Sequence, residues 1–417
     1  MPSLYEIKSR AKTLARDSLK WSEGLYRLYV SIKGPLEEMG AAQSLRFYRE
    51  EASRRGIRVP KEEALQSALR RRLESRGIYP VPKPKGALHI FLTFPLALWE
   101  STLPKILSPF GKVTVFEWRS LGFDDASPRW LKEREGMNRL MLEAFEKAHA
   151  DHPVDVVFGY LSGHNTNPET LRAMANRGAV ILNICMDDKG GFPGPLEGGR
   201  YRSPAAIASA VDLNLTTSPE CVIKYLVHGG SAMFWPLAAD PALHKPYDVP
   251  FDIDVSFIGG KHCWRPIFIK RLRKMGIDVK AFGPGWENGP VVGEELIKIY
   301  SRSRINLGFS AVGNSRNVRY LKIRDFEIPM SGGLLVTQDN PELASCYEIG
   351  KEIVVYENEF DCAEKIRWVL DHPAQAAQIR EAGRRRALRD HTWERRFSGL
   401  FQLVGMLNQQ VGGCNLI

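Results

Sequence analysis

The stretch NVRYLKIRDFEIPMSGGLLVT, at residues 317–337, contains the pattern that decides the fold of this chain. Its apolar residues recur at steps of three and four positions, which predicts a helix with one buried face. These residues are Tyr320, Ile323, Phe326 and Met330. We expect the helix to stop at residues 331–333, Ser-Gly-Gly, because glycine readily adopts the left-handed cap conformation. Residues 334–337 then predict a short buried strand.

The sequence before this helix predicts a site for a phosphate group. Residues 305–310 are strand-like and lead into the polar loop 311–315, so the unit is strand, loop, helix, strand. The helix opens among Asn, Ser and Arg residues, and free backbone N–H groups beside cations favour a phosphate. Glu327, in the body of the helix, is placed to hold two ribose hydroxyls. The alternative for Glu327 is an intrahelical pair with Arg324.

The rest of the chain alternates apolar strands with helices in two series. The first series predicts strands at 88–94, 113–118, 154–161, 179–186, 213–218 and 233–238, with helices near 99–107, 128–149 and 168–177. The second adds strands at 255–259, 279–283 and 353–356, with helices near 265–275, 360–371, 374–389 and 393–409. Continuous apolar strands separated by helices are typical of parallel sheets covered on both faces.

These residues resemble a known family. Phe326-Glu327 followed by Gly332-Gly333 and an apolar strand is similar to the donor-binding signature of nucleotide-sugar-dependent glycosyltransferases of the two-domain GT-B type. Within them the chain is most similar to the spore-maturation (CgeB-like) group. Further matches lie at 282–286, 300–303, 350–356 and 391–396, so the resemblance covers about residues 252–397. The family signature usually carries two glutamates; Glu327 matches the second, and Arg319 occupies the first position.

The resemblance implies an α/β fold with two Rossmann-like parallel-sheet domains facing a cleft. We expect an α-helical, basic N-terminal extension at 1–80, an acceptor domain at 86–240, a nucleotide-sugar-binding domain at 252–390, and a crossing helix and tail at 391–417. Prolines at 80–84 and 241–250 are typical of the linkers between these parts.

The resemblance also implies a donor site in the second domain. Residues 257–265 run from a strand through Gly259 and Gly260 into a helix, and a glycine turn lets a backbone approach a ligand closely. Arg265 is the better phosphate ligand than Lys261 because a guanidinium binds two oxygens at once. A bare Gly-Gly-Lys is also common as a simple turn. The expected donor-binding residues are Gly259, Gly260, Lys261, Arg265, Gly283, Trp286, Asn317, Arg319, Lys322, Arg324, Glu327 and Gly332.

Several of these assignments keep an alternative. Trp286, at the end of Phe-Gly-Pro-Gly-Trp, is placed either to frame the nucleobase or to lie buried under a tight turn. Of Lys322 and Arg324, one is expected to reach the phosphate or sugar and the other to be a surface charge. Arg319 is the favoured cation because its amide and side chain are predicted to lie at the positive helix end.

Catalytic candidates follow two strands of the first domain. His164 follows the third strand, and Asp187 and Asp188 follow the fourth, so all three are expected at carboxyl ends of parallel strands. An inverting enzyme would use one of them as the general base; a retaining one would use them to orient acceptor or sugar. The alternative for each aspartate is to cap the next turn. Adjacent Asp187 and Asp188 differ from the Asp-x-Asp pattern of metal-dependent transferases, so we expect no catalytic metal and no cofactor.

Composition limits the class of protein. Of 417 residues, 44% are hydrophobic and 25% charged, which fits a globular chain of more than one domain. No apolar run predicts a membrane span or a secretory signal. Scattered cysteines favour free thiols used in packing, and we expect a cytoplasmic protein. They are Cys185, Cys221, Cys263, Cys346, Cys362 and Cys414.

The N-terminal part carries most of the net charge of +10, with 19 Lys or Arg against 10 Asp or Glu in residues 1–85. Helices are predicted at 3–32, 41–55 and 60–76. This part is expected either to contact a membrane surface or another protein, including a second copy of the chain, or to be an ordinary solvated surface. No nucleic acid is expected, because no recognition motif accompanies the charge.

The sequence therefore predicts a glycosyltransferase of hexosyltransferase type that moves a sugar from a nucleotide-diphosphate-sugar to an acceptor molecule. The alternatives are a sugar-nucleotide epimerase or phosphorylase of the same fold, and a non-catalytic scaffold that binds nucleotide or a partner. Arg319 in place of a glutamate is the residue that keeps the scaffold alternative open.

Overall fold

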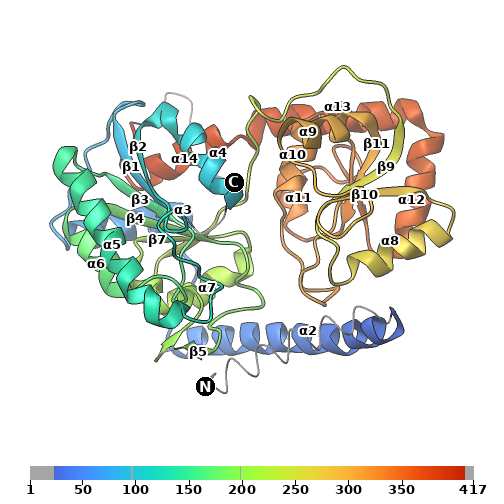
Figure 1. Ribbon diagram of the computed structural model, residues 1–417. Coiled ribbons are helices and arrows are strands. Elements are labelled where there is room, and N and C mark those ends of the chain that lie inside the picture. The colour runs from blue at the N-terminus through green and yellow to red at the C-terminus, as the bar shows by residue number, and fades with distance from the viewer. Residues whose placement is uncertain (1–22, 95–96, 198, 409–417) are drawn as a thin grey trace. The chain divides into compact units, whose positions relative to one another are not determined.

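The computed structural model describes residues 23–94, 97–197 and 199–408 and divides into two compact units (Figure 1). Of the described residues, unit 1 comprises 23–42 and Pro241–Arg386, and unit 2 comprises those within Gln43–Asp240 and residues 387–408. Each contains one parallel sheet with helices packed against it, so the predicted α/β fold with two parallel sheets is confirmed. Cys414 and the predicted helix segment before residue 23 lie outside the described residues.

Unit 2 holds a six-stranded sheet in the order β2-β1-β3-β4-β7-β8, and all neighbouring strands pair in parallel. Its strands are β1 (Leu88–Thr93), β2 (Gly111–Phe116), β3 (Val156–Gly159), β4 (Val180–Cys185), β7 (Leu213–Thr216) and β8 (Ala232–Phe234). The connecting helices are α4 (Ala97–Leu107), α5 (Trp130–Asp151), α6 (Pro168–Asn176) and α7 (Val222–Val227). The last helix, α14 (Trp393–Leu403), also belongs to unit 2, where Phe401 packs edge-on against Phe110.

Unit 1 holds a five-stranded parallel sheet in the order β10-β9-β11-β12-β13. Its strands are β9 (Ile253–Ile258), β10 (Val279–Phe282), β11 (Ser303–Leu307), β12 (Leu335–Gln338) and β13 (Val354–Tyr356). Its helices include α8 (Arg265–Lys274), α9 (Gly293–Arg302), α10 (Arg324–Met330), α11 (Leu343–Cys346) and α12 (Glu359–Asp371), and α13 (Pro373–Asp390) begins in this unit.

This strand order creates a topological switch point in unit 1. From β9 the chain passes to β10 on one side of the sheet and then to β11 on the other. The loops that follow β9 and β11 therefore diverge at their carboxyl ends, and such a divergence is where open α/β sheets bind ligands. The glycine turn after β9 lies at this point.

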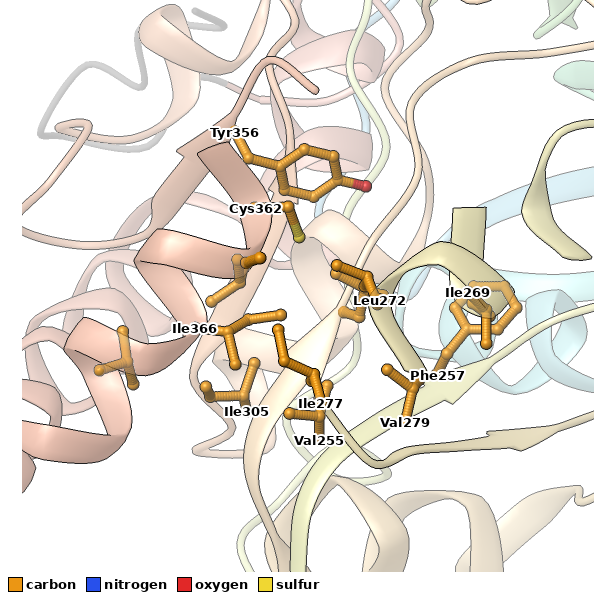
Figure 2. Packing of buried hydrophobic residues seen from close by; sticks show 14 of the residues in the cluster. Val255, Phe257, Ile269, Leu272, Ile277, Val279, Ile305, Tyr356, Cys362 and Ile366 are labelled. Carbon is orange, nitrogen blue, oxygen red and sulfur yellow. The ribbon is translucent and has the colours of Figure 1, made fainter. Parts of the chain in front are cut away.

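An apolar core fixes the position of that turn. Val255 and Phe257 of β9, Ile305 of β11, and Ile269 and Leu272 of α8 are all buried in one cluster (Figure 2). Full burial of a side chain of this kind contributes about 1.5–3 kcal/mol, so β9 and α8 are firmly anchored on both sides of the turn.

The signature helix is shorter than the sequence predicts. The helix α10 begins at Arg324, whereas the 317–330 pattern places Asn317 and Arg319 at its start. Instead, Arg319 forms an isolated antiparallel bridge with Ala311, and the Tyr320 amide donates to Ser310 O at 3.0 Å. The 311–320 loop thus turns back on itself, and extended backbone satisfies the groups that a longer helix would have bonded. The predicted stop is confirmed, because α10 ends at Met330 and Gly332 has a φ of 75°.

The N-terminal helices also differ from expectation. Residues 23–54 form one helix, α2 (Glu23–Arg54), rather than two helices separated at 33–40, and Pro35 lies inside it. Gly34 and Pro35 are strong breaking signals, but packing of this segment on unit 1 overrides them. A second helix, α3 (Glu62–Glu74), agrees with the prediction at 60–76. No helix of the described residues is long and apolar enough to cross a membrane.

Candidate functional site

The glycine turn after β9 is built by close backbone packing. The Gly259 amide donates to Phe282 O at 2.8 Å, and the Lys261 amide donates to Pro284 O at 2.9 Å. Gly283 has a φ of 121°, and a Cβ added to it would lie 2.5 Å from Gly259 O. Only glycine fits this approach, so the predicted Gly259 and Gly283 do lie together.

Trp286 lies under this turn. Its indole is 7% exposed, packs edge-on against Phe257, and donates from Nε1 to Gly259 O at 2.8 Å. The Lys261 ammonium lies 5.1 Å from the centre of its ring. Of the two alternatives for Trp286, the structure places it as a buried support of the turn.

Positive side chains converge on the turn from two helices. A Cβ added to Gly259 would lie 3.5 Å from a guanidinium nitrogen of Arg265 on α8 and 3.5 Å from one of Arg324 on α10. Arg265 Nη1 donates to Gly260 O at 3.3 Å and lies 3.0 Å from His262 Nε2. Across the described parts of the chain, neither Arg265 nor Arg324 forms an ion pair with a carboxylate. We call Arg265, Arg324 and Lys322, together with the imidazole of His262 beside them, the cation cluster.

The electrostatics of the cation cluster favour an anion. Burial, and then repulsion from Arg324, lowers the pKa of Arg265 to about 10. Burial, and then Arg265, Arg324 and Lys322, lowers the pKa of His262 to about 4. Charges that depress one another's protonation in this way are stabilised when an anion arrives between them.

Asp325 fixes the backbone next to this cluster. The carboxylate is buried and accepts a 2.7 Å hydrogen bond from the Lys322 amide and a 3.4 Å bond from the Thr337 hydroxyl. Burial raises the pKa of Asp325 to about 6, although the Lys322 amide and Arg324 favour the charged form. Asp325 therefore holds the turn into α10, and with a pKa of about 6 its carboxylate is mostly ionised at neutral pH.

Glu327 lies on the same helix with a different partner from the expected one. Its carboxylate lies 3.4 Å from His244 Nε2, and the two side chains are 15% and 13% exposed. Burial and the nearby Glu327 raise the pKa of Tyr300 well above its usual value. Within the described ranges, the ion pair of Glu327 is with His244 and not with Arg324. Glu327 is thus a fixed carboxylate at the edge of the site, and its ribose role stays a prediction.

The remaining predicted donor residues are distributed around the loop before α10. The Asn317 amide and side chain bind Glu38, and Arg319 donates to Arg316 O and Asp339 O at 3.1 and 3.0 Å. Arg319 therefore faces backbone carbonyls and not a helix start. Lys322 lies 5.1 Å from the ring centre of Tyr320. Gly332 lies past the end of α10, and a Cβ added to it would lie 3.2 Å from Pro246.

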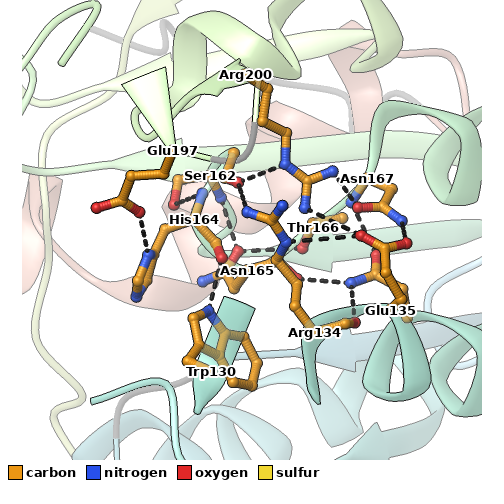
Figure 3. A network of polar contacts seen from close by, with 12 residues as sticks. Trp130, Arg134, Glu135, Ser162, His164, Asn165, Thr166, Asn167, Glu197 and Arg200 are labelled. Atoms are coloured by element: carbon orange, nitrogen blue, oxygen red, sulfur yellow. Dashed lines mark hydrogen bonds and ion pairs between the residues drawn. The ribbon is translucent and has the colours of Figure 1, made fainter. Parts of the chain in front are cut away.

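In unit 2, His164 belongs to a dense polar network (Figure 3). Its Nδ1 lies 3.0 Å from Glu197 and its Nε2 lies 2.8 Å from Asp125 O. Arg134 and Arg200 both donate to Gly163 O, which fixes the loop that contains His164. Both ring nitrogens are therefore engaged, and the geometry favours a structural role for His164.

The two aspartates after β4 lie in opposite environments. Asp188 is 1% exposed and accepts a 2.9 Å hydrogen bond from the Tyr225 hydroxyl, while burial raises its pKa. Asp187 is exposed, and its carboxylate accepts a 3.0 Å hydrogen bond from Tyr160. Of the three catalytic candidates, Asp187 is the one whose carboxylate faces solvent.

Three side chains of this site received no role from the sequence, and they are His262, Asp325 and His244. His262 stood inside the quoted glycine turn, and its spacing of three residues before Arg265 was the available signal. Asp325 and His244 had no signal, because their contacts depend on the tertiary fold. Among the described residues, no group of three or more His, Cys, Asp or Glu lies close enough to hold a metal ion.

Comparisons with known proteins bear on the family and the fold of the chain. A sequence model of the family described as "Glycosyl transferase-like" matches residues 265–402, from the start of α8 into α14. A comparison with curated protein sequences gives no match. The matched segment is a third of the chain and includes Arg265, Arg324 and Glu327.

Solved structures share the fold. A sucrose-phosphate synthase from Thermosynechococcus elongatus aligns with a TM-score of 0.51 at 14% identity, over 74% of this chain and 96% of that one. A glycosyltransferase from Rickettsia africae aligns with a TM-score of 0.51 at 11% identity, over 76% of this chain and 99% of that one. The Anabaena protein HepE, in complex with UDP and glucose, aligns with a TM-score of 0.52 at 12% identity, over 75% of this chain and 99% of that one. The chain therefore has a GT-B-like fold.

Proposed function

We propose that this protein is a glycosyltransferase of hexosyltransferase type that takes a sugar from a nucleotide-diphosphate-sugar and passes it to an acceptor molecule. The observation that carries the proposal is the cation cluster around Gly259, at the switch point of the unit 1 sheet. Half-buried guanidinium groups without carboxylate partners among the described residues fit the two charges of a diphosphate. The "Glycosyl transferase-like" match over residues 265–402 supports the same function.

The donor-binding residues take separate roles in this proposal. Gly259 and Gly260 let the diphosphate approach the backbone, and Arg265, Arg324 and Lys322 neutralise its charge as it leaves. Glu327 accepts hydrogen bonds from the ribose. Lys261, Gly283 and Trp286 support the turn, while Asn317, Arg319 and Gly332 shape the loop and helix end beside it.

Asp187 is the proposed acceptor-side residue. An inverting reaction would use it as the general base for the acceptor hydroxyl, and a retaining reaction would use it to orient acceptor or sugar. His164 and Asp188 support the polypeptide around it. Catalysis is proposed to need no metal, and the chain is proposed to belong to the CgeB-like group and to act in the cytoplasm.

The N-terminal part keeps its predicted roles as proposals. The helix α2 exposes large apolar side chains at three- and four-residue steps, which supports contact with a membrane surface or a second protein, including a homodimer. They are Leu25, Leu28, Ile32, Leu36 and Met39.

A non-catalytic scaffold is the second candidate. The observation that favours it is Arg319, which stands where the family has a glutamate and which the structure engages with Arg316 O and Asp339 O. A scaffold would bind nucleotide without turning over a sugar donor.

A thermal-shift screen tests the donor site. UDP, GDP, ADP and dTDP and their sugars would be added to wild type and to Glu327→Ala, beginning with UDP because HepE contains it. A ligand at 100 times its dissociation constant stabilises the fold by about 2.7 kcal/mol. We expect one nucleotide to raise Tm in wild type and to do so less in the variant. A Tm unchanged by every nucleotide would refute the donor site.

A further inference from the structure

The first half of α2 contacts both loops that border the cation cluster. Residues 23–42 of α2 belong to unit 1, together with the glycine turn and the 311–320 loop. Gly34 is buried, and a Cβ added there would lie 2.5 Å from Asn314 O. Gly40, on the same helix, is exposed and would meet nothing within 4 Å. The helix α2 therefore packs closely on the 311–320 loop at Gly34, whereas an added methyl group at Gly40 would point into open space.

Two adjacent carboxylates of α2 bind the loop. Glu38 accepts hydrogen bonds from the Arg316 and Asn317 amides at 2.9 and 3.2 Å, and from the Ser315 hydroxyl and the Asn317 side chain at 3.0 and 2.9 Å. Glu37 accepts from the Asn314 amide at 2.7 Å and from its side chain at 2.9 Å. Burial opposes the charge of Glu38, but the bonds from Asn317, Arg316 and Ser315 outweigh it and hold its pKa below the usual value.

A third contact reaches the glycine turn itself. The Tyr26 hydroxyl donates to Cys263 O at 2.8 Å. Cys263 has a φ of 55°, and among the described residues it is the one non-glycine with a positive φ. A residue with a side chain adopts this conformation at a cost, so the turn depends on contacts that hold it. Cys263 lies between His262 and Trp264, two residues before the start of α8 at Arg265.

The two loops are also tied to each other next to the cation cluster. Trp264 Nε1 donates to Asn314 O, and the Arg316 guanidinium lies 3.6 Å from the centre of the Trp264 ring. Trp264 directly precedes Arg265, whose guanidinium points at Gly259. A shift of the 313–317 loop would therefore move Trp264 and, through it, Arg265.

We infer that Tyr26, Gly34 and Glu38 of α2 are positioning residues for the diphosphate-binding cation cluster. The helix acts through the 313–317 loop and Trp264, so it sets the placement of Arg265 and His262 without touching the ligand. This inference rests on the proposed function, because it gives the N-terminal extension a part in donor binding.

The experiment compares Gly34→Ala with Gly40→Ala in the full chain. Affinity for inorganic pyrophosphate and for UDP is measured by calorimetry, and amide hydrogen exchange is followed at residues 261–264 and 313–317. Gly34→Ala pushes α2 from the loop, so we expect faster exchange in both segments and binding of both probes about tenfold weaker. Gly40→Ala should leave exchange and affinity as in wild type, because nothing opposes the added methyl group.

Substitutions of Glu38 separate positioning from general stability. Glu38→Ala should weaken pyrophosphate binding to a similar extent, about tenfold, and Glu38→Gln should recover part of the loss because one acceptor oxygen remains. Glu50→Gln, an exposed carboxylate later on α2, serves as the matched control and should change nothing.

The outcomes distinguish this inference from the proposed function. If wild type binds neither pyrophosphate nor UDP, the cation cluster is not a diphosphate site, and both statements are overturned. If wild type binds them and Gly34→Ala and Glu38→Ala bind equally well, the function stands and the positioning role is refuted. Faster exchange with unchanged affinity refutes it too.

Discussion

Two pairs of partly or fully buried arginines in this molecule lie in opposite surroundings. In unit 2, Arg134 and Arg200 both donate to Gly163 O, and each has a Glu135 oxygen within 3.7 or 3.8 Å (Figure 3). In unit 1, Arg265 and Arg324 converge on Gly259 and, in the described ranges, neither pairs with a carboxylate.

The difference teaches how to separate structural charges from binding charges. Arg134 and Arg200 use their donors to fix a loop, so their charges are already compensated by the protein. Burial lowers the pKa of Arg134, Arg200 and Arg265 alike, but Glu135 opposes the shift in the first two, whereas Arg324 adds to it in Arg265 and brings its pKa to about 10. Two guanidinium groups that repel each other in this way are suited to bind an anion, because the anion offsets the repulsion between them.

The largest expected effect comes from substituting one arginine of each pair and comparing the two variants. Arg134→Gln should lower the free energy of unfolding by about 2–4 kcal/mol, because it removes a buried guanidinium that donates to Gly163 O and pairs with Glu135, and should leave pyrophosphate affinity unchanged. Arg265→Gln should keep or raise Tm and weaken pyrophosphate binding about 10- to 100-fold. Thermal unfolding and calorimetry measure both. A loss of affinity in Arg134→Gln equal to that in Arg265→Gln would break the comparison.

A buried carboxylate next to the cluster gives a pH-dependent effect on stability. Folding raises the pKa of Asp325 from 3.8 to about 6, mainly by burial, so its stabilising contribution is complete below pH 4 and is lost as pH rises through 6. Asp325→Asn keeps an acceptor for the Lys322 amide and removes this dependence. We expect the variant to gain up to about 3 kcal/mol relative to wild type between pH 4 and pH 7.

Denaturant unfolding of both proteins across that range measures the gain. A constant difference between Asp325→Asn and wild type at every pH would show that Asp325 does not titrate as inferred.

The third effect concerns ligand affinity and pH. Burial and the cluster cations hold the pKa of His262 at about 4, and a bound diphosphate would raise it. Binding then takes up a proton, so pyrophosphate affinity should rise as pH falls from 7 toward 5, by about two- to tenfold. The variant His262→Gln should show a flatter profile. Equal slopes in calorimetric titrations of the two proteins would exclude His262 from the site.

The smallest effect is expected under the turn. Trp286→Phe removes the bond from Nε1 to Gly259 O but keeps an aromatic ring on Phe257, so it should cost about 1 kcal/mol of stability. The preference among UDP, GDP, ADP and dTDP should not change, because Trp286 lies below the turn. A changed preference in the thermal-shift screen would restore Trp286 to the nucleobase.

Most of the fold could be predicted from the sequence, because alternating apolar strands and helices determine parallel sheets almost locally. The stop of α10 after Met330 followed from glycine chemistry in the same way. The start of α10 could not be predicted, because the pairing of Ala311 with Arg319 competes with helical spacing at Tyr320 and Ile323. The continuity of α2 through Pro35 likewise depends on its contacts with Asn314 and Asn317.

The candidate site was predictable where residues neighbour a glycine turn. Gly259, Arg265 and Gly283 lie close together, as their places after parallel strands suggested. The surroundings of His164 and Glu327 were not predictable, since Glu197 and His244 reach them from distant parts of the chain. Residue type and strand position locate a site, whereas the partner of each charge depends on the whole fold.

Release of nucleoside diphosphate from the best-binding nucleotide sugar tests the central claim most directly. A coupled assay would follow this release for wild type and for Arg265→Ala at saturating donor. We predict release by wild type above the enzyme-free rate, and about 100-fold slower release by Arg265→Ala, because one charge that stabilises the leaving diphosphate is gone. A donor that binds wild type but is never cleaved would contradict the transferase and support the scaffold.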